Sequence, residues 1–209
     1  MDVDAARRPR FKSSLQPVIS GDDGLFLISE GGQAWLRDPV YPALARMLDG
    51  THEVEAIFTS LAGRYPAEQP FAGWLREPDG REVRGTLLGG CLSLLVATLG
   101  TPFAPDLEAG IVFWEDVGEP PYRIDRMLTH LGLSGNLANI AGMIVGSLGE
   151  GQGPDGEPAD WSATVADALA GFSWPLAWGL ESGHVAPNRT LPVGLPARLE
   201  RGRLLLGDG

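Results

Sequence analysis

Short, wholly apolar runs in the second half of the chain restrict its fold more than any other feature. Three of them have the length of a buried strand rather than a helix, and they lie at 110–115, 140–145 and 175–180. A helical pattern precedes each run, at 91–99, 120–131 and 165–169. Apolar strands that alternate with helices predict a sheet covered by other elements. The expected fold class is therefore α/β or α+β.

Proline and glycine divide the chain into an expected arm, two domains and a junction. Residues 1–9 are expected to form a flexible arm. Residues 10–68 are expected to form a small domain with strands at 15–19, 24–29 and 33–36 and helices at 41–48 and 54–61. Residues 69–80 lack periodicity and form the predicted junction. Residues 81–209 form the second domain, with further strands expected at 83–88, 190–194, 197–199 and 203–206.

Composition excludes several classes of function. The net charge is −11, and a chain this acidic repels phosphate backbones, so we expect no nucleic-acid partner. Cys91 is the single cysteine, which rules out an intramolecular disulfide and is typical of a reducing compartment. The first twenty residues lack an apolar signal segment, and the apolar run at 92–99 is too short to span a bilayer. We therefore expect a cytoplasmic protein without a membrane partner.

Two polar residues follow apolar strands in a way that indicates chemistry. Glu115 ends the run at 110–115, where a carboxylate is costly to bury without a partner. His184 follows the run at 175–180, within Ser-Gly-His. A carboxylate that orients a histidine, which in turn activates a nucleophile, is the logic of a serine-hydrolase triad. On this pattern alone, an exposed Glu115 and an ordinary loop histidine remain the alternatives. His52 and His130 lack the spacing of metal ligands.

Three longer motifs resemble those of the LD-carboxypeptidases, also called murein tetrapeptide carboxypeptidases. Residues 85–95 are similar to that family's GxLxGGNLSLL segment and include Gly89 and Gly90. Residues 113–128 are similar to its FLEDVGExPYRIDRML segment and include Arg123 and Arg126. Residues 179–194 are similar to its GLxxGHxxxxxTLPxG ending and include Gly183.

The resemblance implies a function and a set of roles. The family uses a Ser-Glu-His triad to release the terminal D-alanine of murein tetrapeptide by cutting an L,D peptide bond, and a related branch inactivates microcin C. By carry-over, Glu115 orients His184, and His184 is the general base. The implied partner is a muropeptide or peptide substrate, without a metal or cofactor. The implied fold of this region is a swivelling β/β/α domain, and a homodimer is expected because complete members commonly form one.

The sequence departs from the family at the nucleophile. The family's serine lies in a GxSD turn of a separate N-terminal lobe, and no GxSD occurs here. We therefore identify no nucleophile and expect the chain alone to be inactive unless a separate lobe supplies the serine. Ser134 and Ser147 lie in turns that only loosely resemble nucleophile turns, and Ser182 is given no role. Cys91 occupies the position of the family's asparagine and is interpreted as a small buried residue.

The first domain resembles a different family. Residues 8–12, 24–30 and 48–50 are similar to the recognition domain of thiazole/oxazole-forming peptide cyclodehydratases. That resemblance implies a partial winged helix that binds a leader peptide along the edge of its third strand. The third helix of that domain is replaced here by residues 69–74. A leader-peptide-binding module and an inactive fused remnant are therefore the alternative functions.

Overall fold

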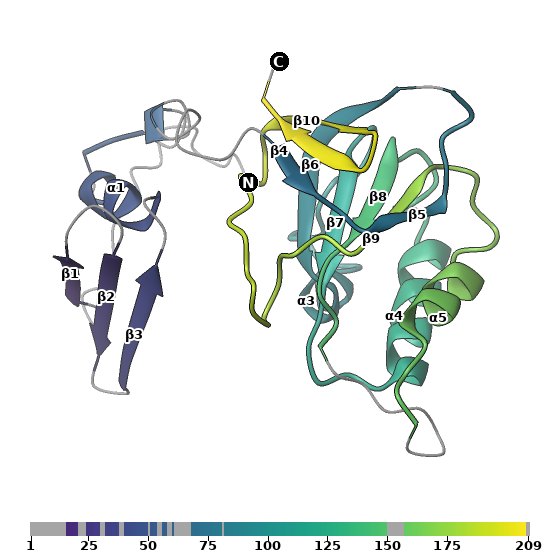
Figure 1. Cartoon of the computed structure of the whole chain (residues 1–209), viewed down its shortest axis with the longest axis horizontal. Coiled ribbons are helices and arrows are strands. Elements are labelled where there is room, and N and C mark those ends of the chain that lie inside the picture. The colour runs from purple at the N-terminus through teal and green to yellow at the C-terminus, as the bar shows by residue number, and fades with distance from the viewer. Residues whose placement is uncertain are drawn as a thin grey trace. The chain divides into compact units, whose positions relative to one another are not determined.

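The chain forms two compact units, Met1–Pro66 and Ala67–Gly209 (Figure 1). The structure, a computed structural model, describes residues 16–20, 24–29, 32–37, 40–49, 51–53, 56–57, 60, 68–80, 82–149 and 157–207.

The first unit contains a three-stranded antiparallel sheet. Its order is β1 (Gln16–Ser20), β2 (Gly24–Ser29) and β3 (Gly32–Arg37), and α1 (Val40–Met47) follows. Ala43 and Ile57 are buried and form a small apolar cluster. The three predicted strands and the first predicted helix are confirmed. Most of the helix expected at 54–61 lies outside the described residues.

The second unit is built on an eight-stranded mixed sheet in the order β4-β11-β10-β6-β7-β8-β9-β5. Its centre is parallel and consists of β6 (Val83–Cys91), β7 (Ile111–Glu115), β8 (Gly142–Val145) and β9 (Leu176–Trp178). Antiparallel strands extend it on both sides, namely β5 (Gly73–Arg76) beside β9, and β10 (Pro196–Glu200), β11 (Arg203–Leu206) and β4 (Glu68–Pro70) beyond β6. The predicted mixed α/β class is confirmed.

Each face of this sheet carries its own apolar core. Val112 and Trp114 of β7 pack in one cluster with residues of α3 (Leu92–Ala97), α4 (Pro121–Leu133) and α5 (Trp161–Ala168). Ile111 and Phe113 alternate with them and pack in a second cluster with residues of β10 and β11. Each large side chain buried in this way contributes about 1.5–3 kcal/mol. The helices therefore cover one face, and the curled antiparallel strands cover the other (Figure 1).

The structure departs from the expected elements in two places. Residues 69–80, expected as a junction, contain β5 and most of β4, which pair with β9 and β11. The strand expected at 190–194 is wrong, because this segment is a loop that ends in a turn. Pro192 has no N–H to donate, and Gly194 has a φ of +100°, so the segment cannot continue a ladder. Near its end, the Gly194 N–H donates to the Leu87 carbonyl of β6.

No helix among the described residues combines the length and the apolar character needed to cross a membrane.

Candidate active site

The parallel strands β6, β7 and β8 end at the same edge of the sheet, and Glu115 lies at that edge. Glu115 is the last residue of β7, whose five residues are all buried. In the β6–β7 ladder it is opposite Cys91, the last residue of β6. Outside the carboxyl ends of parallel strands, loops converge and side chains are free to meet a ligand. The glutamate side chain is only 6% exposed, so it needs polar partners there.

His184 supplies those partners from the loop that follows β9. Its Nδ1 lies 3.0 Å from Glu115 Oε1 and 2.8 Å from Oε2. Its backbone N–H donates to Oε2 at 3.1 Å. A carboxylate only accepts hydrogen bonds, so this contact places the proton of the imidazole on Nδ1. The structure thus brings the two predicted residues together across 69 positions of sequence.

The opposite side of the imidazole remains open. The His184 side chain is 54% exposed, and no hydrogen bond from the described residues reaches its Nε2. The buried carboxylate thus fixes the orientation of the imidazole through Nδ1.

The pair raises the pKa of His184 above its ordinary value of 6.5. The hydrogen bond that His184 Nδ1 donates to Glu115 is the main cause, and the negative charges of Glu115 and then Asp116 add to it, while partial burial opposes it. The folded chain therefore holds the imidazole proton more tightly than the unfolded chain does.

This pKa shift predicts a pH dependence of stability. A raised folded pKa stabilises the fold fully below the unfolded pKa of about 6.5, and the stabilisation is lost as pH rises through the folded value. We expect the free energy of unfolding, measured by urea denaturation, to fall over this window more steeply in the wild type than in His184→Gln. Identical slopes for the two chains would contradict the expectation.

Two glycines leave room for the pair. Gly183 has a φ of +143°, and a Cβ there would lie 2.8 Å from Glu115 Oε2. A Cβ on Gly146, just after β8, would lie 2.5 Å from the Ser182 carbonyl oxygen and 3.0 Å from the Glu115 Cβ. The backbone of the histidine loop therefore approaches the glutamate as closely as only glycine permits. This close approach explains why the predicted motif residue at position 183 is a glycine.

Hydrogen bonds across its base close the histidine loop. The Arg189 N–H donates to the Glu181 carbonyl, and its guanidinium makes two bonds to Glu181 Oε2. The buried Ser182 donates its hydroxyl to the Arg189 carbonyl, and its own carbonyl accepts the Ser147 N–H. Asn188 Oδ1 accepts the Gly183 N–H. Ser182 was expected to have no role because it lies only two positions from His184, and a buried hydroxyl that joins two loop arms leaves no periodic signal in the sequence.

The candidate serines do not contact His184 through a hydrogen bond within the described residues. Ser134 ends α4, donates its hydroxyl to the Leu131 carbonyl, and accepts bonds from Asn136, as a helix-terminal residue does. Ser147 is half-buried beside the histidine loop. Cys91 is half-buried, with its Sγ 3.1 Å from Ser93 Oγ.

The remaining motif residues have separate positions. Gly89 of β6 passes so close to β7 that a Cβ would lie 1.8 Å from the Phe113 carbonyl oxygen, whereas Gly90 faces open space. Arg123 is exposed on α4 and pairs with Glu119 at 3.2 Å. Arg126 is exposed and lines a hollow between α3 and α4 with Ser93 and His130. Within the described parts of the chain, no hydrogen bond or ion pair joins these arginines to the Glu115–His184 pair.

No cluster of three potential metal ligands occurs among the described residues.

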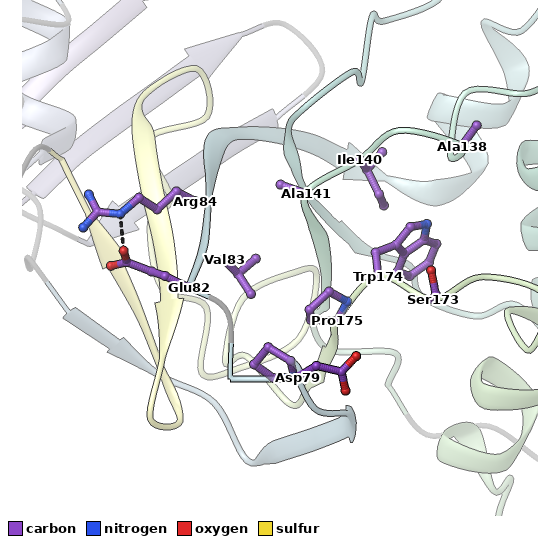
Figure 2. A pocket seen from close by; sticks show the side chains of 11 residues that line it. Asp79, Glu82, Val83, Arg84, Ala138, Ile140, Ala141, Ser173, Trp174 and Pro175 are labelled. Atoms are coloured by element: carbon purple, nitrogen blue, oxygen red, sulfur yellow. Dashed lines mark ion pairs between the residues drawn. The ribbon is translucent and has the colours of Figure 1, made fainter.

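A second hollow lies at the far edge of the sheet (Figure 2). It has a volume of about 360 Å³ and is lined by residues at the starts of the parallel strands, including Val83, Ala141 and Pro175. Asp79 and Glu82 line the same hollow, and Glu82 forms an ion pair with Arg84 at 2.6 Å. Because Glu115 is at the strand ends, this hollow is separate from the Glu115–His184 pair.

Comparisons with known proteins agree with the fold. A family profile described as the LD-carboxypeptidase C-terminal domain matches residues 84–199. The murein tetrapeptide carboxypeptidase of Pseudomonas aeruginosa is 36% identical over 126 residues, which are 59% of this chain and 40% of that protein. The probable murein peptide carboxypeptidase of Bacillus subtilis is 35% identical over 119 residues, or 56% of this chain and 37% of its own length. The chain thus spans about two fifths of these relatives.

Solved structures show the same fold. The muramoyltetrapeptide carboxypeptidase of Oxalobacter formigenes has a TM-score of 0.59 at 28% identity, covering 81% of this chain and 65% of that one. The microcin C7 self-immunity protein MccF, in complex with aspartyl sulfamoyl adenosine, has a TM-score of 0.55 at 16% identity, covering 78% and 59% respectively. The second likeness concerns the fold alone.

Proposed function

Because this chain belongs to the LD-carboxypeptidase family, we propose that its second unit provides the glutamate and histidine of a serine carboxypeptidase site. Glu115 is the orienting carboxylate and His184 the general base. The observation that carries the proposal is the contact of both Glu115 carboxylate oxygens with Nδ1, because it engages one ring nitrogen and leaves Nε2 available to a nucleophile. The serine comes from a separate lobe, since no residue of the chain matches the family's nucleophile turn.

The proposed reaction is acyl transfer followed by hydrolysis. His184 Nε2 takes the proton of the serine hydroxyl as the serine oxygen attacks the substrate carbonyl. The imidazolium, stabilised by Glu115, then gives that proton to the amine of the leaving D-amino acid. Water, activated by the same nitrogen, releases the acyl group from the serine. The negative charge on the oxyanion of the tetrahedral intermediate needs hydrogen-bond donors, which come from the lobe that carries the serine.

The proposed substrate is a murein tetrapeptide whose terminal D-alanine is released. The names of the relatives from P. aeruginosa and O. formigenes support this choice, and so do their identities of 36% and 28%. A peptide bond between an L-centre and a D-centre is the bond cleaved. The microcin C7 self-immunity protein holds aspartyl sulfamoyl adenosine in its solved structure, so an aminoacyl-nucleotide substrate is the runner-up.

The experiment that tests the proposal measures D-alanine release from murein tetrapeptide. The chain is assayed alone and with an added N-terminal lobe from a complete relative. We expect activity only with the added lobe, and we expect His184→Ala to abolish it while His130→Ala, an exposed histidine on α4, retains it. Activity of the chain alone would place a nucleophile within it and would direct attention to Ser147. If no combination releases D-alanine, the result would favour an inactive remnant.

A second candidate function concerns the first unit. Its meander leaves β3 with a partner on one side only among the described strands, and such an edge can accept an added strand. We propose leader-peptide binding along β3 as this alternative. Titration of the chain with a cyclodehydratase leader peptide, followed through the amide resonances of β3, tests it. Shifts confined to β3 and the adjacent elements would support strand pairing, and unchanged resonances would reject it.

A further inference from the structure

Asp116 is a buried carboxylate that the proposed reaction does not use. It follows Glu115 directly and is only 5% exposed. A buried charge is costly unless hydrogen bonds replace its water. Its partners therefore indicate what it does in the fold.

Both partners of Asp116 are backbone amides. Oδ2 accepts the N–H of Ser93 at 2.8 Å, and Oδ1 accepts the N–H of Val117 at 2.9 Å. Ser93 lies in the first turn of α3, and the residue at the N-cap of that helix, Cys91, makes no side-chain cap bond. A carboxylate is a good acceptor for the unpaired amides of a first turn. Asp116 therefore caps α3 from the neighbouring strand.

This cap joins the two strand ends that flank the proposed site. Cys91 and Glu115 are opposite one another in the β6–β7 ladder, and α3 begins directly after Cys91. The bond from Asp116 to Ser93 thus fixes the end of β7 against the end of β6, one residue beyond Glu115. The bond therefore ties the backbone that carries the orienting carboxylate to the start of α3.

Asp116 also contributes charge. Its carboxylate adds to that of Glu115 in raising the pKa of His184. At the base of the histidine loop, Glu181 and Arg189 neutralise each other in a 2.7 Å ion pair. Near Glu115 and Asp116, β6, α3 and the end of β8 contribute Cys91, Ser93 and Gly146, none of which is an aspartate, glutamate, lysine, arginine or histidine.

We propose that Asp116 is a positioning residue for the Glu115–His184 pair, holding the end of β7 against the start of α3. The proposal rests on the proposed function, because positioning has meaning only if the pair acts. Its test nevertheless uses the isolated chain, so its failure is distinguishable from a failure of D-alanine release.

The test is an NMR titration of the His184 imidazole in the wild type, Asp116→Asn and Asp125→Asn. Asp125 is exposed on α4 and controls for the loss of one negative charge. The amide of asparagine keeps one acceptor and replaces the other by a donor, so one of the two backbone bonds is lost. We expect the pKa of His184 to fall in Asp116→Asn and the Ser93 amide to exchange faster, with neither change in Asp125→Asn. Equal titrations in the two variants would overturn the proposal.

A measurement on the wild type covers the case in which Asp116→Asn does not fold. In that case the test is the hydrogen-exchange rate of the Ser93 amide. If its bond to Asp116 persists, this amide should exchange as slowly as the amides of β7. Exchange at the rate of an unstructured peptide would overturn the proposal. With the added lobe, Asp116→Asn is also expected to lower kcat with little change in KM and to move the acidic limb of the pH–rate profile to lower pH.

Discussion

Replacing Glu115 with glutamine is expected to reduce D-alanine release in the lobe-complemented assay by about three to four orders of magnitude. Glutamine keeps the volume of the buried side chain but removes its charge. Of the two carboxylate oxygens that contact His184 Nδ1, one becomes an NH₂ donor, so a single acceptor remains for both the ring nitrogen and the backbone N–H of His184. The imidazole then loses both its fixed tautomer and the charge that stabilises its protonated form.

The matched control for this change is Glu108→Gln. Glu108 is an exposed glutamate between α3 and β7, so its neutralisation changes the net charge by the same amount without touching the pair. We expect the control to retain wild-type kcat and KM. The imidazole titration adds an independent readout, because the pKa of His184 should fall in Glu115→Gln even without the added lobe. A Glu115→Gln enzyme that keeps more than about a tenth of wild-type kcat would refute the assigned role.

Gly89→Ala is expected to be the most destabilising small substitution in the second unit. A Cβ at this position would lie 1.8 Å from the Phe113 carbonyl oxygen and 2.8 Å from its carbonyl carbon, and these are backbone atoms of a fully buried strand. The φ of +123° adds strain for any residue with a Cβ. Separation of β6 from β7 would relieve the clash only by breaking their parallel ladder. We expect a loss of about 3 kcal/mol or more in the free energy of unfolding.

The neighbouring Gly90→Ala is the control for Gly89→Ala. Gly90 has a φ of +149°, but a Cβ added there would meet no heavy atom within 4 Å, so only conformational strain opposes the change. We expect it to cost about 1–2 kcal/mol. Urea denaturation of the two variants measures the difference directly. If both lose the same free energy, close backbone approach is not the reason for the glycine at 89.

Local sequence was sufficient wherever a single segment carried the signal. The apolar run that ends in Glu115 predicted β7, and the amphipathic pattern after Pro120 predicted α4. A strand buried on both faces is apolar throughout, and a helix buried on one face has apolar residues at helical spacing, so both patterns can be recognised within about ten residues. The turn residues around 21–24 and 30–32 predicted the three strands of the first unit. Long motifs identified Glu115 and His184 as the residues to examine. In the structure, His184 Nδ1 lies 2.8 Å from Glu115 Oε2.

Tertiary structure decided what depends on partners distant in sequence. Strands β4 and β5 are three and four residues long, and each exists because it pairs with a strand that lies far along the chain, β11 and β9 respectively. Residues 190–194 had the composition of a strand, but Pro192 and Gly194 left them as a loop against β6. The hydrogen bond that the Ser93 N–H donates to Asp116, 23 positions along the chain, belongs to the same class. Sequence alone predicted the chemical groups of the site, whereas the folded chain determined which backbone atoms hold them in place, because those contacts join segments that no local pattern relates.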